Sequence, residues 1–270
     1  MSNSFSVSNG VRQGGILSPY LFNIHVDDLS CDLNSLHIGC SVDNIIVNHL
    51  MYADDIVLLA PSVAGLQKLI SVCEKFASCH DIMYNTKKSV SMYIRSVPLK
   101  HSKLPPVSLN HNVLSEVDSV KYLGHFISNK LTDDEDIARQ CRMIYIQTNT
   151  LIRKFHMCSA HVKLTLFRTF CSPMYTAHLW WNYKKATINR LYVAYHNGMK
   201  MLMSLSKFES TSLVCTVYNV QCCPAIIRNF IYKFICRVED SVNCILNALT
   251  QSALRFSSRI RSHWRKLLFM

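Results

Sequence analysis

Residues 44–60 form an apolar run, rich in Ile, Val and Leu, that is interrupted in its middle by Ala53-Asp54-Asp55. The apolar arms on either side have the composition of β-strands. These apolar arms put the two carboxylates at the tip of a buried hairpin and not in a polar loop. The segment therefore predicts a β-hairpin with Asp54 and Asp55 at its tip.

Such a tip is chemically unusual. Adjacent carboxylates repel each other and cost stability unless a divalent cation supplies the compensating charge. On a strand, Tyr52 and Asp54 would point to the same face, so a ring and a carboxylate would share one cleft. For an isolated Asp-Asp pair, a solvated turn is the more common interpretation. The apolar arms favour a metal site here.

The rest of the first half predicts short, mixed elements. A Gly-rich loop, Gly10 to Gly15, opens a helix over residues 16–33, with Pro19 placed in its first turn. Ser62 caps a second helix that runs to about Cys79. A turn at residues 85–88 leads into a strand at 90–94, and further strands fit 107–109 and 122–127. The mixture predicts an α+β fold with one antiparallel sheet.

Beyond residue 130 the pattern changes to long helices. Thr132, with the acidic residues that follow it, predicts a helix N-terminus, and helices fit residues 132–155, 160–170, 188–205 and 226–249. The predicted domains are therefore 1–130 and 131–270.

The charge changes at the same place. Residues 1–130 hold 10 basic and 10 acidic side chains, whereas residues 131–270 hold 19 and 7, so the whole net charge of +12 lies in the second half. Clustered Lys and Arg release condensed counterions when they meet phosphates, which predicts a polyanionic partner. The plainer alternative is a basic, solvated surface.

Composition excludes several classes of protein. With 49% hydrophobic residues, 7 Gly and 7 Pro, the chain is neither disordered nor collagen-like. It contains no long uncharged apolar run and no basic, apolar leader, so neither a membrane span nor a signal peptide is expected. Twelve scattered cysteines without a CxxC pair fit a reduced, intracellular protein of the cytoplasm or nucleus.

Four motifs in order carry a family resemblance. They are Gly10-Val-Arg-Gln-Gly-Gly-Ile-Leu-Ser-Pro19, Tyr52-Ala-Asp-Asp55, Asn85-Thr-Lys-Lys-Ser89 and Tyr122-Leu-Gly124. Together they resemble the palm of reverse transcriptases, the RNA-directed DNA polymerases of LINE-like, non-LTR retrotransposons. Residues 174–181 are similar to the region that follows the palm in one branch of that family.

The resemblance implies roles for single residues. Asp54 matches the metal-binding aspartate, Asp55 its partner, and Lys88 the lysine that contacts or protonates the leaving phosphates; these three are the implied catalytic residues. Tyr52 would lie near the primer end, and Gly124 matches the primer-grip hairpin. The residues that would line the incoming nucleotide and template are Gly10, Arg12, Gln13, Gly14 and Ser18. The implied cofactor is Mg²⁺, with Mn²⁺ as an alternative, and the implied partners are an RNA template, a DNA primer and a dNTP.

One departure from the family pattern concerns the metal. The family requires another aspartate on a strand before the Gly-rich loop, but only nine residues precede Gly10 and none is acidic. The resemblance therefore predicts a C-terminal fragment that lacks this strand and the fingers and binds Mg²⁺ weakly. Asp27 and Asp28 fall in the helix after the loop and are poor substitutes.

Other candidate sites are weaker. The cysteines and histidines near residues 141–161 lack the spacing of a structural zinc site. Trp180 and Trp181, followed by Lys184 and Lys185, fit either a base-stacking platform or a core segment. The basic stretch 259–266 fits either a tail or an amphipathic helix that binds RNA.

The leading hypothesis is a partial reverse transcriptase palm followed by a basic helical thumb and C-terminal region, inactive alone. The alternative is a non-catalytic, nucleic-acid-binding remnant that uses the second half. A third hypothesis is a degenerate reading frame, whose unpaired strand edges would promote aggregation.

Overall fold

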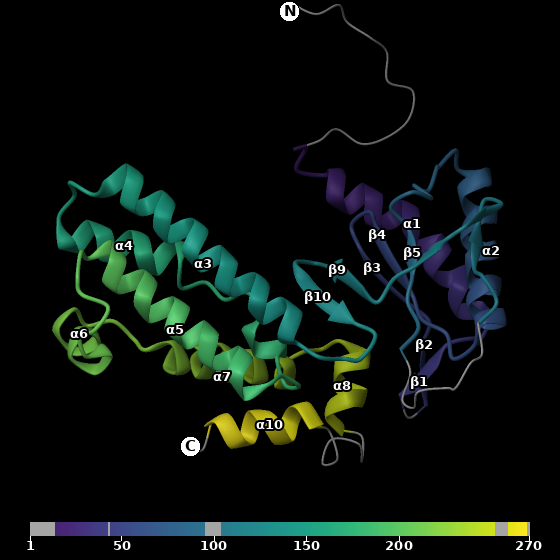
Figure 1. The fold of residues 1–270 in the computed structure, drawn as a ribbon. Helices are drawn as coiled ribbons and strands as arrows, with labels where there is room; N and C mark the ends of the chain where they lie inside the picture. The colour runs from purple at the N-terminus through teal and green to yellow at the C-terminus, as the bar shows by residue number, and fades with distance from the viewer. Residues whose placement is uncertain (1–13, 43, 95–103, 252–258, 269–270) are drawn as a thin grey trace, which may run out of the picture. The chain divides into compact units, whose positions relative to one another are not determined.

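The computed structural model describes residues 14–42, 44–94, 104–251 and 259–268, and it is α+β as expected (Figure 1). Its contacts divide the chain into two compact units, Met1–Ser91 with Leu99–Glu116, and Met92–Pro98 with Val117–Met270. The division lies at residue 116, before the boundary expected near 130. The reason is that strands β9 (Ser119–Tyr122) and β10 (His125–Ser128) belong with helix α3 (Asp134–Phe155), which β10 contacts.

Two helices build the core of the first unit. Helix α1 (Ser18–Ser35) packs against α2 (Val63–Cys79), and Ser62 caps α2 as predicted, its hydroxyl accepting the Gly65 N–H at 3.1 Å. The buried residues shared by the two helices are Leu29, Leu33, Leu69, Cys73 and Phe76. Both predicted helices are therefore confirmed, within two residues at their ends.

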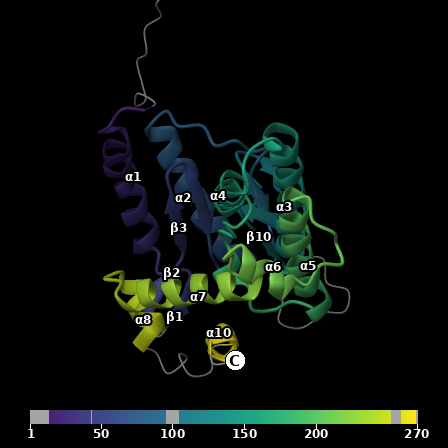
Figure 2. The same ribbon diagram turned by 90° about the vertical axis from the view of Figure 1, so that its left-hand side faces the viewer.

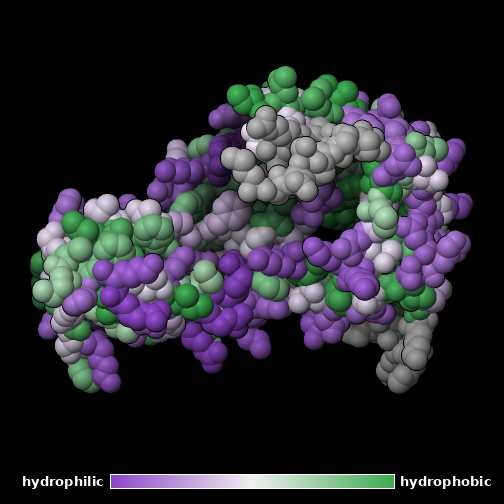
Figure 3. Space-filling view, turned by 90° about the horizontal axis from the view of Figure 1, so that it is seen from above, coloured by the Kyte–Doolittle hydropathy of each residue, from purple (hydrophilic) through white to green (hydrophobic). Residues whose placement is uncertain are grey.

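The first turns of α1 are not covered as an amphipathic helix would be. Ile24 is 72% exposed, and Ile16, Leu17, Tyr20 and Leu21 are exposed as well. Apolar side chains of this kind stay on the surface of both units, and green areas interrupt the purple surface in Figure 3. Periodicity thus identified the helix correctly but not the part of it that is buried, because burial depends on which other segments pack on it.

The predicted single sheet is wrong for the part of the chain that the structure describes. The strands of the first unit pair two by two, as β1 (Cys40–Val42) with β2 (Ile45–Val47), β3 (His49–Tyr52) with β4 (Asp55–Leu58), β5 (Val90–Ser91) with β8 (Ser115–Glu116), and β6 (Ser108–Leu109) with β7 (Asn112–Val113). All are antiparallel except β5 with β8. Strands of two to four residues offer too few ladder hydrogen bonds to extend a sheet sideways.

Helices dominate the second unit, as predicted. Helix α3 crosses α5 (Lys185–Leu202) closely, and a Cβ on Gly198 would lie 2.8 Å from the Thr148 hydroxyl oxygen, so this crossing requires glycine. The remaining helices are α4 (Ala160–Phe170), the 3₁₀ turn η1 (Ala177–Leu179), α6 (Thr211–Val217), α7 (Cys223–Glu239), α8 (Cys244–Gln251) and α10 (Arg259–Leu268) (Figure 2). The helix predicted over residues 226–249 is two helices, because α7 ends at Glu239 and α8 begins at Cys244.

A buried carboxylate joins three segments of this unit. Asp136, in the first turn of α3, is 0% exposed and lies where the β9–β10 hairpin, α3 and the η1 segment meet. Its two oxygens accept hydrogen bonds from Thr176 Oγ1 at 2.6 Å, Trp180 Nε1 at 2.8 Å, Arg139 Nε at 2.9 Å, His125 Nδ1 at 3.1 Å and the Phe126 N–H at 3.3 Å. Burial alone would raise the pKa of Asp136, but the hydrogen bonds from His125, Thr176 and Arg139 outweigh burial and hold the pKa well below its ordinary value.

The neighbouring Asp133 corrects a prediction. The cap expected at Thr132 is absent, and the residue that precedes α3 is Asp133, whose side chain makes no capping hydrogen bond. Its carboxylate instead accepts the backbone N–H groups of Trp181 and Asn182, both at 2.8 Å. Burial raises the pKa of Asp133, and these two hydrogen bonds oppose the rise. The acidic start of α3 therefore anchors a distant segment as well as matching the helix dipole.

Trp180 belongs to the core. It is 1% exposed, and its indole N–H is used by Asp136, so its face is not free for a base. Of the two interpretations of this aromatic pair, the core segment is correct for Trp180.

All twelve cysteines are free thiols. Among the described helices, none combines the length and the apolarity needed to cross a membrane.

Removing the charge of Asp136 should destabilise the second unit selectively. Asp136→Asn replaces the buried carboxylate that faces Arg139 and His125 with a neutral amide, for which we expect a loss of about 3 kcal/mol in unfolding free energy. Tryptophan fluorescence during urea unfolding reports this unit alone, because Trp180, Trp181 and Trp264 all lie in it. The control Glu135→Gln, exposed in the same helical turn, should change stability by less than about 0.5 kcal/mol.

His178 should make the same unit sensitive to acid. Burial, with a smaller contribution from the nearby Arg237, lowers the pKa of His178 to about 4. Between pH 6.5 and about 4 the unfolded chain therefore binds the proton more readily, and stability falls as the pH falls through that window. His178→Phe retains a ring for the contact with Phe234 and should lose less stability from pH 7 to pH 4.5 in fluorescence-detected urea unfolding. Parallel curves for the two proteins would contradict this assignment.

Candidate functional site

The β3–β4 hairpin carries the acidic tip that the sequence predicts. Its register pairs Tyr52 with Asp55, leaving Ala53 and Asp54 as the two-residue turn, and Ala53 has a φ of 52°. On one face of the hairpin Met51, Ile56 and Leu58 pack against the core of the first unit. On the other face the side chains are directed outward. The tip is therefore held by a buried face while its carboxylates reach solvent.

The pair of side chains that shares a face differs from the predicted one. Tyr52 and Asp55 are directly opposite on the two strands, so their side chains lie on the same face. Asp54 is in the turn, where the alternation that would align it with Tyr52 does not apply. Tyr52 is 63% exposed, and Asp54 and Asp55 are exposed as well. The expected cleft shared by Tyr52 and Asp54 is thus replaced by an open surface.

A polar network behind the hairpin escaped the sequence reasoning. Asn48 is 1% exposed, and its side chain donates from Nδ2 to the backbone carbonyl of Leu33 in α1 at 2.7 Å. The backbone carbonyl of Asn48 accepts the Leu59 N–H at 2.7 Å. His49 lies 2.6 Å from Asn48 Oδ1 and 2.8 Å from the Ser30 hydroxyl of α1. Burial lowers the pKa of His49. The signal was Asn48-His49, two polar residues inside an apolar run, which need buried partners.

The other implied site residues lie in separate places. Gly10, Arg12 and Gln13 fall outside the described residues. Gly14 has a φ of 76°, in the region that favours glycine, and Ser18 begins α1. Lys88 is exposed in a turn that Asn85 closes, because the Asn85 side-chain oxygen accepts the N–H of Lys87 and of Lys88, each at 3.1 Å.

Gly124 lies in the second unit, in the tight turn between β9 and β10. Leu123 and Gly124 have φ angles of 45° and 83°, as a type I′ turn requires. The ring of Tyr175 is 3.9 Å from where a Gly124 Cβ would stand, which leaves room for one. Glycine is therefore selected at this position by backbone conformation and not by crowding.

The acidic tip offers the type of ligand that a divalent cation prefers, but too few of them. Carboxylate oxygens are the ligands that Mg²⁺ prefers, and both side chains are accessible. Nevertheless, the described ranges contain no group of three or more His, Cys, Asp or Glu side chains suited to holding a metal ion. Asp54 and Asp55 alone would hold Mg²⁺ weakly.

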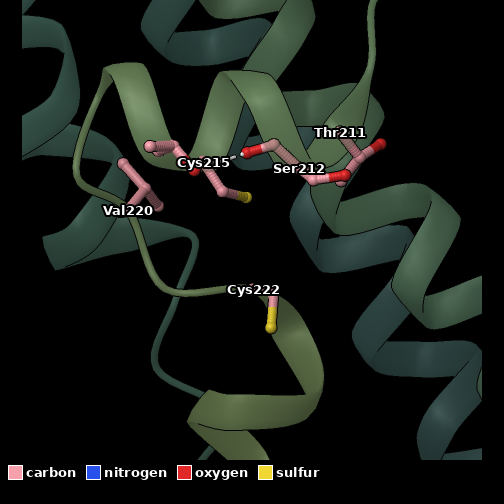
Figure 4. Close-up of a pocket in the computed structure, with 6 residues that line it drawn as sticks. Thr211, Ser212, Cys215, Val220 and Cys222 are labelled. Carbon is pink, nitrogen blue, oxygen red and sulfur yellow. Dashed lines mark hydrogen bonds between the residues drawn. The ribbon is translucent and has the colours of Figure 1, made fainter.

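A surface pocket of about 480 Å³ lies elsewhere, in the second unit (Figure 4). Its six lining residues, from α6 to the start of α7, are Thr211, Ser212, Cys215, Thr216, Val220 and Cys222. None of them is charged, so a phosphate would find no counter-charge. Burial also raises the pKa of the Cys215 thiol, which disfavours the nucleophilic thiolate.

Truncating Asn48 should loosen the support of the hairpin. Asn48→Ala removes the donor to the Leu33 carbonyl and leaves a small cavity, for which we expect about 2 kcal/mol of destabilisation. Amide hydrogen exchange should then quicken in β3 and β4 before it does in α3. Asn34→Ala, exposed on α1, is the matched control and should leave these rates unchanged. Equal protection of β3 and β4 in both variants would contradict a supporting role for Asn48.

Comparison with known proteins shows what the first half of the chain is similar to. Residues 2–127 match the family described as reverse transcriptase (RNA-dependent DNA polymerase). The chain is 35% identical over 129 residues to a retrovirus-related Pol polyprotein from the type-2 retrotransposable element R2DM of Drosophila melanogaster, covering 46% of this chain and 12% of that protein. It is 20% identical over 275 residues to the RNA-directed DNA polymerase from mobile element jockey of the same species, covering 95% of this chain and 29% of that protein.

A third relative is the probable RNA-directed DNA polymerase from transposon BS, 24% identical over 215 residues, covering 74% of this chain and 23% of that protein. The chain spans less than a third of the length of each of these three relatives. The matched segment holds the Gly-rich loop, the acidic hairpin, the Asn85 turn and the Gly124 turn. Residues 2–127, just under half of the chain, are thus similar to the reverse transcriptase domain, and the three relatives are Pol polyproteins or RNA-directed DNA polymerases of transposable elements.

Proposed function

We propose that this chain supplies the acidic hairpin of an RNA-directed DNA polymerase that copies an RNA template onto a DNA primer. The observation that carries the proposal is the exposure of Asp54 and Asp55 on a hairpin anchored from behind, within the segment that matches the family. A solvated Asp-Asp turn would not need a buried network such as that of Asn48 to position it. Residues 1–130 would then form part of a palm, and residues 131–270 a thumb and C-terminal region.

The reaction follows from the chemistry of polymerases. The primer 3′-hydroxyl attacks the α-phosphate of a dNTP, a new P–O bond forms, and pyrophosphate leaves. A Mg²⁺ ion, when bound by Asp54 and Asp55, would neutralise phosphate charge.

The chain's own residues would position the reactants. Tyr52, beside Asp55 on the open face, would pack against the primer end, and Lys88 would neutralise the departing phosphates. The Gly-rich loop at residues 10–15 would let backbone approach the triphosphate, and the start of α1 at Ser18 favours an anion. The Gly124 turn would contact the primer strand. These assignments rest on the family motifs, residue by residue.

Cation binding tests the role of the hairpin directly. We expect the full chain to bind Mn²⁺ weakly, with a dissociation constant on the order of 1 mM, because two carboxylates are a sparse ligand set. Asp54→Asn with Asp55→Asn should abolish this binding in an electron paramagnetic resonance titration of free Mn²⁺. Asp27→Asn with Asp28→Asn removes an equally exposed, adjacent pair on α1 and should leave it intact.

Two results would contradict what we expect here, the first the proposal itself and the second only the inactivity of this chain by itself. If Mn²⁺ binding were equal in both double variants, Asp54 and Asp55 would not be the metal ligands. Primer extension on an RNA template by this chain alone, lost in Asp54→Asn, would show that the chain is active by itself, whereas the sparse ligand set leads us to expect none.

A second candidate function is nucleic-acid binding that does not need the acidic hairpin. The observation in its favour is the concentration of the net charge of +12 in residues 131–270. Binding of this kind would depend on salt and survive Asp54→Asn.

A further inference from the structure

Helix α10 is docked on the second unit by its apolar side. Trp264, 7% exposed, donates from Nε1 to the His178 carbonyl at 2.9 Å and packs edge-on against Phe234 of α7, with ring centroids 5.6 Å apart. The Tyr183 hydroxyl lies 3.0 Å from His263 Nε2. Helix α10 contacts α7, and it lies below α7 in both Figures 1 and 2. The basic stretch 259–266 is therefore an amphipathic helix with a defined orientation and not a tail.

The opposite side of α10 is cationic. At 100° per residue, Lys266, Arg259 and Arg265 lie about 160°, 140° and 100° around the helix from Trp264, on the side away from it, whereas Arg261 lies only about 60° away. Arg259, Arg265 and Lys266 are exposed there, with Arg261 partly covered, and α10 contains no acidic residue. We call Arg259, Arg265 and Lys266 the cationic face.

Neighbouring elements extend the positive surface. The contact between Trp264 and Phe234 brings α10 beside the stretch of α7 that carries Lys233 and Arg237, both exposed. The contact between His263 and Tyr183 brings it beside Lys184 and Lys185, which are also exposed. The acidic side chains along these neighbouring segments are the buried Asp133, which accepts the Trp181 and Asn182 N–H groups, together with Asp134, Glu239 and Asp240. Cations outnumber acids, so a polyanion would be attracted to this surface.

We propose that the cationic face of α10 binds the sugar–phosphate backbone of nucleic acid, outside the acidic hairpin. The inference rests on the second candidate function and assigns it to a particular helix. A membrane surface is disfavoured, because an amphipathic helix binds lipid through its apolar side, and here that side is packed against the protein. Arginine on a rigid helix is suited to phosphate, which its planar donors contact in pairs.

The salt dependence of binding tests the proposal. The full chain is titrated with a fluorescent 20-base-pair DNA duplex and with an RNA hairpin, without divalent cation or dNTP, between 50 and 200 mM salt. Arg265→Gln with Lys266→Gln should make the slope of log affinity against log salt less steep by about 1.8 for the duplex. The fall in affinity over this salt range should then be about tenfold smaller than for the natural chain.

Matched variants distinguish an effect of where the cations lie from an effect of the total charge of the chain. Lys68→Gln with Lys75→Gln removes two exposed cations from one face of α2 and should leave the slope unchanged. Arg265→Lys with Lys266→Arg retains the charge and should retain the slope. An unchanged tryptophan emission maximum in each variant shows that the second unit, which holds Trp264, remains folded.

The possible outcomes distinguish a failure of this inference from a failure of the second candidate function. If the α10 and α2 variants lowered the slope equally, attraction would be diffuse and the inference wrong, while nucleic-acid binding would stand. If the natural chain bound neither duplex nor hairpin, the second candidate function would fail together with the inference. Binding to phosphatidylserine vesicles that needs Arg265 and Lys266, with duplex binding unaffected, would assign the face to lipid and overturn the proposal.

Discussion

The buried carboxylate of Asp136 sets the geometry of the second unit. A charged group with no exposed surface is tolerated only when its oxygens are satisfied, and donors from β10, α3 and the segment around η1 satisfy them. A shift of β10 or of the segment around η1 would remove hydrogen bonds from a buried charge that then keeps only Arg139 of its own helix and the remaining donors. The Gly124 turn belongs to the same hairpin as Phe126 and His125, so the orientation of that turn is tied to the helical core through one side chain.

The acidic hairpin of the first unit is supported in another way. No basic side chain forms an ion pair with Asp54 or Asp55 among the described residues, and their repulsion is left to solvent or to a cation. Support comes from behind, where Asn48 and His49 connect β3 to α1 and apolar side chains meet the core. The polar groups behind the hairpin are hydrogen-bonded, whereas the carboxylates at its tip have no ion pair among the described residues. Such an arrangement suits a site that receives a charged ligand.

Local sequence patterns predicted individual caps, helices and turns more reliably than they predicted how strands pair and where a long helix ends. The cap at Ser62, helix α4 and the turn at Asn85 match the structure because each depends on residues a few positions apart. The single sheet was wrong, and so was the continuous helix over residues 226–249, because pairing and termination depend on longer-range contacts. At the site, the sequence identified the acidic tip correctly but predicted that Tyr52 and Asp54 share a face. The turn begins after Tyr52, so Tyr52 shares its face with Asp55 instead.

Sequence alone was sufficient for the reverse transcriptase resemblance, the acidic tip and the separation of charge between the two halves, because all three are properties of residue identity and spacing. Folding was needed to show that Asp133 and Asp136 bind segments more than forty residues away, and that stretch 259–266 turns Trp264 inward and the cationic face outward. The physical reason is that burial and hydrogen bonding depend on which segments meet, and residues distant in the chain meet only once it has folded.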